Sequence, residues 1–195
     1  MSFREACDAV CAPGTMFEIT ETDVLGVPTN VFTGTPPNIR VLFQLAATRQ
    51  DDYIVYEDER WSMPRLLDMA GQIGHALVND LHVGKGDRVA IAMRNYPEWI
   101  AAFAAITSVG AIAVPLNAWW VTDEMVYALD DSGAKVVLAD EERLGRIDHA
   151  APGQIKAKVV VVRTPEAAAG GATRLDDLLV DGATMPEMEI DPDDD

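Results

Sequence analysis

Two cysteines and three histidines are the residues whose side chains could ligate a metal ion or act as nucleophiles. Cys7 and Cys11 are spaced C-x-x-x-C near the N-terminus, and the histidines, which are scattered along the chain, are His75, His82 and His149. A structural zinc site needs two further ligands close to such a pair, and a disulfide scaffold needs more cysteines. We therefore expect free thiols in a reducing cytoplasm and no metal site.

The sequence offers no set of Ser, His and Asp residues for nucleophilic catalysis. Each histidine falls on an expected helix or near its end, where a packing or surface role is the simpler interpretation. Asp130 and Asp131 are adjacent near an expected helix end, and adjacent residues of a helix do not face each other. They make a weak acid–base pair, so we predict no catalytic residue in this chain.

Glycine-rich phosphate loops are missing from the positions where an α/β sheet would carry them. No G-x-G-x-x-G follows Met93, and Gly84-Lys85 lacks the first glycine and the hydroxyl residue of a G-x-x-x-x-G-K-[ST] loop. The segment from Gly170 to Arg174 could present amides and a guanidinium group to an anion. A flexible connection to a helix over 175–179 explains it better.

Net charge argues against two classes of partner. The 195 residues carry a formal charge of −17, and the segment from Asp176 to Asp195 holds nine acidic residues and no basic one. Nucleic acids and anionic lipid surfaces both need clustered Lys and Arg. We expect no nucleic-acid partner, and we interpret the C-terminal segment as a solvated acidic tail.

The run from Trp99 to Leu116 has no charged residue and is eighteen residues long, near the lower limit for a membrane-spanning helix. Gly110 and Pro115 interrupt it, and after Gly110 the Ala-rich pattern changes to Ile-Ala-Val, which is typical of a strand. We predict a helix, a glycine stop and a buried strand instead of a transmembrane segment. The N-terminus lacks the apolar region of a secretory signal, so a cytoplasmic protein is expected.

The expected elements begin after an irregular N-terminal arm over residues 1–40, which is broken by proline and glycine. A short helix from Val41 and a hairpin over 53–62 follow, and Ser62 is placed to cap a long helix. Asn95 and Thr122 are predicted to cap two later helices, which end at Gly110 and Gly133. A last helix is expected over 141–149. The strands of a mostly parallel sheet, with helices on both faces, are expected at 88–93, 111–114, 135–139 and 158–162.

Several of these segments together resemble one enzyme superfamily. The matching motifs, in order and spacing, are Gly86-Asp87-Arg88-Val89, Asn95 to Trp99, Gly110 to Asn117 and Ser132 to Val136. They are similar to the N-terminal core of the adenylate-forming enzymes, which include acyl-CoA synthetases, luciferases and peptide-synthetase adenylation domains. The resemblance implies that residues 41–195 are an N-terminal α/β subdomain of such an enzyme, most similar to a fatty acid–CoA ligase.

The reaction that the resemblance implies uses ATP with Mg²⁺ and then coenzyme A to convert a carboxylic acid, here a fatty acid, into an acyl-CoA. In the superfamily the catalytic motifs lie downstream, and the stretch from Glu189 to Asp195 looks like the one just before the phosphate loop. No catalytic or cofactor-binding residue is therefore carried over, and the chain alone is expected to be inactive. Trp119 and Trp120 could line part of an acyl cavity, or they could serve a core or interface role.

A non-catalytic binding or interaction module on the same scaffold is the alternative function. The sequence also leaves a homodimer open.

Overall fold

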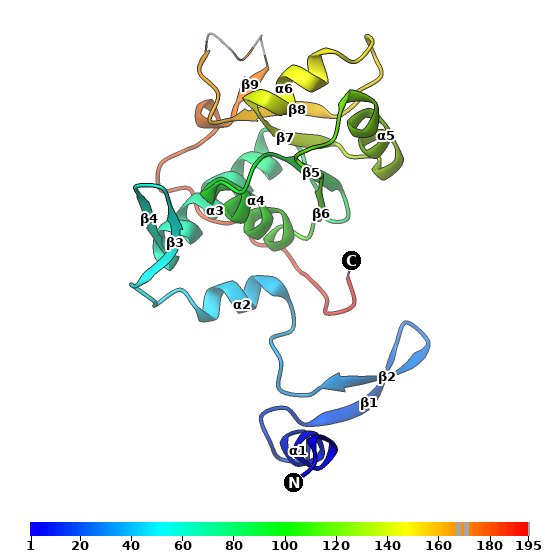
Figure 1. Cartoon of the computed structure of the whole chain (residues 1–195). Coiled ribbons are helices and arrows are strands. Elements are labelled where there is room, and N and C mark those ends of the chain that lie inside the picture. The colour runs from blue at the N-terminus through cyan, green and yellow to red at the C-terminus, as the bar shows by residue number, and fades with distance from the viewer. Residues whose placement is uncertain (167–168, 170–171, 195) are drawn as a thin grey trace.

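A five-stranded sheet forms the centre of the computed structural model, which describes residues 1–166, 169 and 172–194 (Figure 1). Its order is β6-β5-β7-β8-β9, and every neighbouring pair is parallel. The mostly parallel α/β sheet expected from the sequence is therefore confirmed. The fifth strand, β9, lies in the segment that we had interpreted as a flexible connection. The strands are β5 Arg88–Ala92, β6 Ile112–Pro115, β7 Val136–Asp140, β8 Lys158–Val162 and β9 Thr173–Arg174.

The two faces of the sheet carry side chains of different size. In β5, Val89 and Ile91 pack with helices α3 and α4, whereas Ala90 and Ala92 pack with α5 and α6. A strand that is covered on both faces has to be apolar without alternation, as these are. The helices are α3 Met63–Asn79, α4 Pro97–Ser108, α5 Thr122–Ser132 and α6 Glu141–Asp148.

Three of the predicted helix ends agree with the structure. The Ser62 hydroxyl accepts the backbone N–H of Arg65, as predicted. Both Gly110 and Gly133 have positive φ, +69° and +61°, so each ends its helix in the left-handed region that glycine adopts at low cost.

Two predicted caps are wrong. Helix α4 begins after Tyr96 without a side-chain cap, so Asn95 lies one residue too early. Thr122 is already the first residue of α5, and its hydroxyl donates instead to the carbonyl of Arg146 at 2.9 Å. Capping needs the residue in extended backbone just before the first turn, and the path of the preceding loop decides which residue that is.

The uncharged run is divided as predicted. Gly110 separates α4, whose residues are mostly buried, from β6. The expected buried strand is corrected: β6 is the edge strand of the sheet, its first three residues are half-buried and Pro115 is exposed. In the part of the chain that the structure describes, no helix has both the length and the apolarity to cross a membrane.

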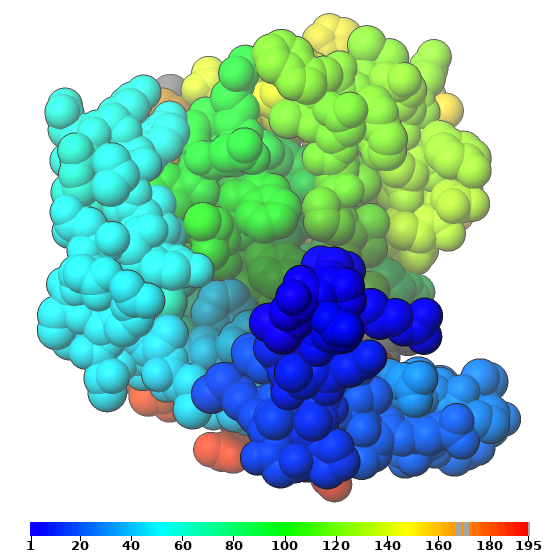
Figure 2. All heavy atoms as spheres, turned by 60° about the horizontal axis from the view of Figure 1, so that its bottom comes forward, coloured from blue at the N-terminus to red at the C-terminus, as the bar shows by residue number. Residues whose placement is uncertain are grey.

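The N-terminal arm contains more regular structure than we expected. It forms α1 Phe3–Val10 and an antiparallel hairpin of β1 Ile19–Val24 with β2 Val27–Phe32. These elements lie apart from the parallel sheet in Figure 1, and in Figure 2 they form the blue lobe that faces the viewer. Helix α1 contributes no buried residue. The arm then leads through α2 Ile39–Leu45 into the predicted hairpin of β3 Asp52–Tyr56 with β4 Glu59–Ser62.

The acidic C-terminal segment is not a free tail, which corrects the interpretation from the sequence. After a single 3₁₀ turn, Leu175–Asp177, in place of the expected helix, the chain runs back over α3 towards α2 (Figure 1). Arg40 donates to the carbonyl of Pro186 at 2.9 Å, and Asn38 donates to the carbonyl of Ile190 at 3.2 Å. An ion pair of 2.7 Å joins Lys85 to Asp194. The segment is thus docked through its backbone, while most of its carboxylates face solvent.

Two glycines of α3 make room for this returning segment. A Cβ atom on Gly71 would lie 3.1 Å from the carbonyl oxygen of Ala183 and 3.2 Å from the amide nitrogen of Met185, and one on Gly74 would meet the Met185 sulfur. A Cβ on Gly145 of α6, by contrast, would meet nothing within 4 Å. Close packing therefore requires a glycine at position 71 but not at position 145.

This difference predicts opposite outcomes for two equal substitutions. We expect Gly145→Ala to raise the free energy of unfolding by about 0.5–1 kcal/mol, because alanine loses less backbone entropy in a helix. Gly71→Ala should instead lower it by about 1 kcal/mol, because the backbone at 183–185 has to shift. Urea unfolding measures both, and faster cleavage by a Glu-specific protease at Glu187 and Glu189 should accompany only Gly71→Ala. An equal gain in both variants would contradict the docking of the segment.

Asp87 closes the loop that leads into β5. Its carboxylate accepts the backbone N–H of Gly84 and the ammonium group of Lys135, each at 2.8 Å. The Gly84 hydrogen bond, followed by that from Lys135, holds the pKa of Asp87 below its ordinary value of 3.8. Because this pKa is lowered in the folded chain, the carboxylate stabilises the fold above pH 3.8 and loses that contribution as the pH falls through its folded pKa.

We therefore expect Asp87→Asn to lower the free energy of unfolding by about 1 kcal/mol at pH 7, because the lost carboxylate is hydrogen-bonded but partly exposed to solvent. The difference from the wild type should shrink between about pH 5 and pH 3. Urea titrations across this range measure it, with Glu21→Gln on the exposed β1–β2 hairpin as the control. A difference that is independent of pH would show that the charge of Asp87 is not what matters.

Candidate functional site

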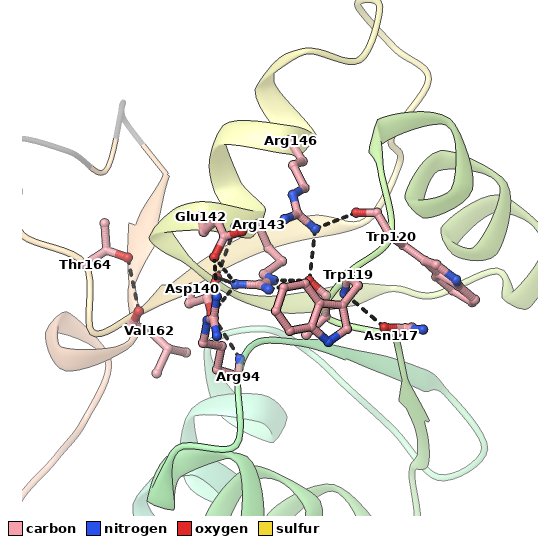
Figure 3. Close-up of polar contacts among 11 residues, drawn as sticks. Arg94, Asn117, Trp119, Trp120, Asp140, Glu142, Arg143, Arg146, Val162 and Thr164 are labelled. Atoms are coloured by element: carbon pink, nitrogen blue, oxygen red, sulfur yellow. Dashed lines mark hydrogen bonds and ion pairs between the residues drawn. The ribbon is translucent and has the colours of Figure 1, made fainter. Parts of the chain in front are cut away.

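The carboxyl ends of β5 and β7 are the place where the connections of the sheet diverge. After β5 the chain enters α4 on one face, and after β7 it enters α6 on the other face. Such a divergence leaves a crevice at the strand ends, which is where open α/β sheets bind ligands. The polar residues at this point are shown in Figure 3.

A buried ion pair lies at the centre of this crevice. The side chain of Asp140 is 5 % exposed and that of Arg143 is 1 % exposed, with 3.2 Å between Oδ2 and Nη1. Asp140 also caps α6, because its Oδ1 accepts the N–H of Arg143 at 3.0 Å, and its Oδ2 accepts the N–H of Arg94 at 3.0 Å. One carboxylate thus joins the end of β7, the start of α6 and the residues after β5.

Two guanidinium groups of α6 reach the loop over residues 117–121, between β6 and α5. The carbonyl of Ala118 accepts from Nε of Arg143 and from Nη1 of Arg146, each at 2.9 Å. Arg146 also donates to the carbonyl of Trp120 at 2.6 Å (Figure 3). Helix α6 therefore also holds the loop that follows the end of β6.

Glu142 balances part of this positive charge at the surface. It accepts from Arg143 at 2.8 Å and from Arg94 at 3.3 Å, and it also contacts Arg146. Burial alone would raise the pKa of Glu142, but the Arg94 hydrogen bond and the neighbouring arginine charges outweigh it and leave the pKa below its ordinary value. The carboxylate consequently stays ionised at neutral pH.

A hollow of about 500 Å³ opens beside this cluster. The Trp119 indole, 71 % exposed, forms one wall, and the Arg94 guanidinium lies 5.2 Å from its ring centre. An indole, a guanidinium and two amides can bind a flat or anionic group, but the lining residues include no Ser, Cys, His, Asp or Glu. These are Tyr56, Arg94, Asn95, Asn117, Ala118, Trp119 and Arg143.

The opposite wall is fixed by Arg163, which follows β8. Its guanidinium lies between two carboxylates, with 2.7 Å to Glu59 and 2.7 Å to Glu98. The rings of Tyr56 and Tyr96 lie 5.3 and 5.1 Å from it. Arg163 therefore attaches the β3–β4 hairpin, with Tyr56, to the start of α4.

The two adjacent tryptophans do not share a cavity. Trp120 points away from the hollow of Trp119 and lines a second, more apolar groove along α5, together with Pro115 and Tyr127. It also packs against the core cluster that contains Leu116 and Met125. Of the pair, Trp119 alone faces the hollow at the strand ends.

The other residues considered from the sequence lie apart from this site. Cys7 and Cys11 belong to α1 and its C-cap, both as free thiols. His75 lies on α3, His82 follows that helix, and His149 caps the end of α6. Among the described residues there is no group of three or more His, Cys, Asp or Glu that could hold a metal ion.

The remaining candidates are likewise engaged elsewhere. Asp130, at the end of α5, pairs with Lys156 at 2.7 Å. Arg174 of β9 pairs with Asp176 at 3.0 Å, and Gly170 and Gly171 lie outside the described residues.

Sequence reasoning missed the residues that build the site. It gave Asp140 no role in a site, yet an Asp three residues before Arg143 and directly after a buried strand has the spacing of a helix cap. Arg143 gave no signal, because nothing in its spacing distinguishes a buried arginine from an exposed one.

Comparison with known families identifies the class of protein. The model of the family described as AMP-binding enzyme matches residues 42–194. The chain therefore belongs to this family, and the resemblance to the adenylate-forming enzymes is confirmed.

The chain is similar in sequence to characterised CoA ligases. The chain is 35% identical over 114 residues to the 3-hydroxybenzoate–CoA/4-hydroxybenzoate–CoA ligase of Thauera aromatica, covering 57% of this chain and 22% of that enzyme. It is 43% identical over 58 residues to the long-chain-fatty-acid–CoA ligase FadD13 of Mycobacterium tuberculosis, covering 30% of this chain and 12% of that enzyme. The chain thus spans only about a fifth or less of these relatives.

Solved structures share the fold. The anthranilate–CoA ligase AuaEII superposes with a TM-score of 0.70 at 23% identity, over 80% of this chain and 30% of that one. The N-terminal domain of FACL13 from Mycobacterium tuberculosis gives a TM-score of 0.64 at 26% identity, over 78% of this chain and 38% of that one. The fold is accordingly that of the N-terminal domain of an adenylate-forming CoA ligase.

Proposed function

We propose that this chain is the N-terminal part of an ATP-dependent fatty acid–CoA ligase. The observation that carries the proposal is the family match over residues 42–194, together with relatives that are named as CoA ligases. The carboxylate of the acid would displace pyrophosphate from ATP to give an acyl-adenylate. The thiol of coenzyme A would then displace AMP and form the thioester.

Support for a fatty acid is narrower than support for CoA ligation. Two of the relatives are named as medium/long-chain or long-chain fatty-acid ligases, whereas others are named for hydroxybenzoate, coumarate or oxalate. The comparison with FadD13 gives 43% identity over 58 residues, against 35% over 114 residues for the hydroxybenzoate ligase. We therefore give the fatty acid priority and treat an aromatic acid as the competing substrate.

The residues described here do not fit the reacting phosphates of Mg-ATP. Within residues 1–166 and 172–194 we find neither a glycine-rich loop with a lysine at a strand end nor a cluster of carboxylates for the metal ion. No step of the reaction is therefore assigned to these residues. We propose that ATP, Mg²⁺ and coenzyme A act in the longer protein, and that this chain alone is inactive.

The contribution of this chain would be to shape the crevice. We propose that Trp119 lines part of the acyl cavity, because its indole is exposed at the strand ends where the sheet offers a ligand site. For Trp120 the packing role is favoured, since its ring lies against the core beside α5. We also propose a cytoplasmic enzyme, which is consistent with its free thiols.

The test is ATP–pyrophosphate exchange on the longest protein that this gene encodes. We expect exchange that depends on a medium- or long-chain fatty acid, and none from residues 1–195 alone with any acid. Exchange with hydroxybenzoates only would replace the fatty acid by an aromatic substrate. Light scattering of the same sample decides between a monomer and a homodimer.

A non-catalytic binding module is the second candidate, and the missing phosphate loop in the described residues favours it. It predicts no exchange from the longest gene product with fatty, aromatic or short acids, whereas a positive control ligase is active under the same conditions. Exchange from residues 1–195 alone would contradict both candidates, since it would require a nucleotide site within this chain.

A further inference from the structure

Besides the Trp120 carbonyl, which accepts from Arg146, the carbonyl of Ala118 attaches the Trp119 loop to α6. It accepts from Arg143 and Arg146 of α6. The backbone amides nearby are satisfied locally: Trp119 N–H donates to Asn117 Oδ1 at 2.9 Å, and Val121 N–H donates to Glu124 at 2.9 Å. These local bonds shape the loop, but they do not place it against β5 or α6.

We propose that Arg143 is a positioning residue, which Asp140 holds in place and which fixes the 117–121 loop so that Trp119 faces the strand-end hollow. The proposal rests on the proposed function only for its effect on substrates. The placement itself is a property of this chain, and it can be measured without any activity.

The geometry requires a guanidinium group at this position. Nε and Nη2 of Arg143 both face the Ala118 carbonyl, while Nη1 faces Asp140 and Glu142. A lysine has a single ammonium group on a flexible stem and cannot serve both sides in one orientation. The side chain is 1 % exposed, so water cannot replace the lost contacts.

Arg146 shares the contacts with the loop, through the carbonyls of Ala118 and Trp120, but it does not contact the buried carboxylate of Asp140. Its side chain is 24 % exposed and its charge pairs with Glu142 at the surface, whereas Arg143 alone reaches both the buried carboxylate and the loop (Figure 3). Asp140 in turn accepts the N–H of Arg94, the residue whose guanidinium lies over the Trp119 ring. The wall of the hollow that Trp119 and Arg94 form is therefore set by one buried pair.

Arg88 provides a matched control at the opposite end of the sheet. Arg88 is partly buried and, like Arg143, donates to backbone carbonyls, those of Ser132 at 2.9 Å and Gly133 at 3.2 Å. Arg88→Lys should loosen the turn before β7 and leave the Trp119 loop unchanged. Comparing it with Arg143→Lys separates loop positioning from a general loss of stability.

Amide hydrogen exchange of residues 1–195 is the primary measurement. In Arg143→Lys we expect the amides of Trp119, Trp120 and Val121 to exchange about ten-fold faster or more, as for the loss of a charged hydrogen bond. The amide of Leu138, in the buried strand β7, should change by a smaller factor. Asp140→Asn should accelerate the same loop amides, and adding it to Arg143→Lys should change them little further, because both act through one pair.

Loop exchange that is unchanged in Arg143→Lys, or that changes only in parallel with Leu138, would overturn the proposal. So would an equal effect of Arg88→Lys on the loop. If Arg143→Lys does not fold, Asp140→Asn carries the same comparison, because its amide retains an acceptor for the cap of α6.

In the longer protein, Arg143→Lys should raise the KM of the acid or of coenzyme A more than it lowers kcat, and Arg88→Lys should not. If the longer protein has no ligase activity, the proposed function fails while the exchange data still decide the role of Arg143. If it is active and neither KM rises, the loop does not shape a substrate site.

Discussion

The buried carboxylate of Asp140 is the interaction on which the strand-end architecture depends. An ionised group taken out of water has to be compensated fully, and here two backbone N–H groups and the Arg143 guanidinium do so. Because these donors come from the residues after β5 and from α6, satisfying one charge fixes two strand ends against each other. Arg143 extends the arrangement to the loop after β6. Removing one member of such a buried pair costs about 3–5 kcal/mol, since the other is left uncompensated, so the strand ends are coupled to one another.

The packing beneath this pair explains why the crevice lies where it does. Alanines on one face of β5 accommodate α5 and α6, while larger residues on the other face meet α3 and α4. The helices that follow β5 and β7 consequently lie on opposite faces, and their divergence opens the hollow. The docked segment after β9 lies across α3 and ties the sheet to α2 and the arm. Fold similarity to CoA ligases at 23–26% identity is consistent with a scaffold defined by packing, on which substrate choice is a local property.

Elements with strong local signals were predictable from the sequence. The β3–β4 hairpin, the Ser62 cap and the helix ends at Gly110 and Gly133 follow from residue chemistry within a few positions, and the structure confirms them. The caps at Asn95 and Thr122 failed because two neighbouring residues competed for one role and the loop path decided between them. The C-terminal segment was wrongly interpreted as a free tail, because its acidic residues are those whose side chains face solvent. It is attached through backbone groups and through the space above Gly71. Amino-acid composition does not reveal either feature.

The sequence by itself determined the class of this protein: a βαβ unit, a parallel sheet and motifs whose order is that of the adenylate-forming enzymes. Such features depend on periodic or local patterns of residues, so they can be recognised in the sequence alone. Only the tertiary structure decided which polar residues matter, because folding brings the Asp140–Arg143 pair to the carbonyl of Ala118, which is 25 positions from Arg143 in the sequence. It also separated Trp119 from Trp120, whose neighbouring positions turn their rings towards different hollows. Side-chain direction and burial are set by the packed neighbours, and those neighbours are distant in sequence.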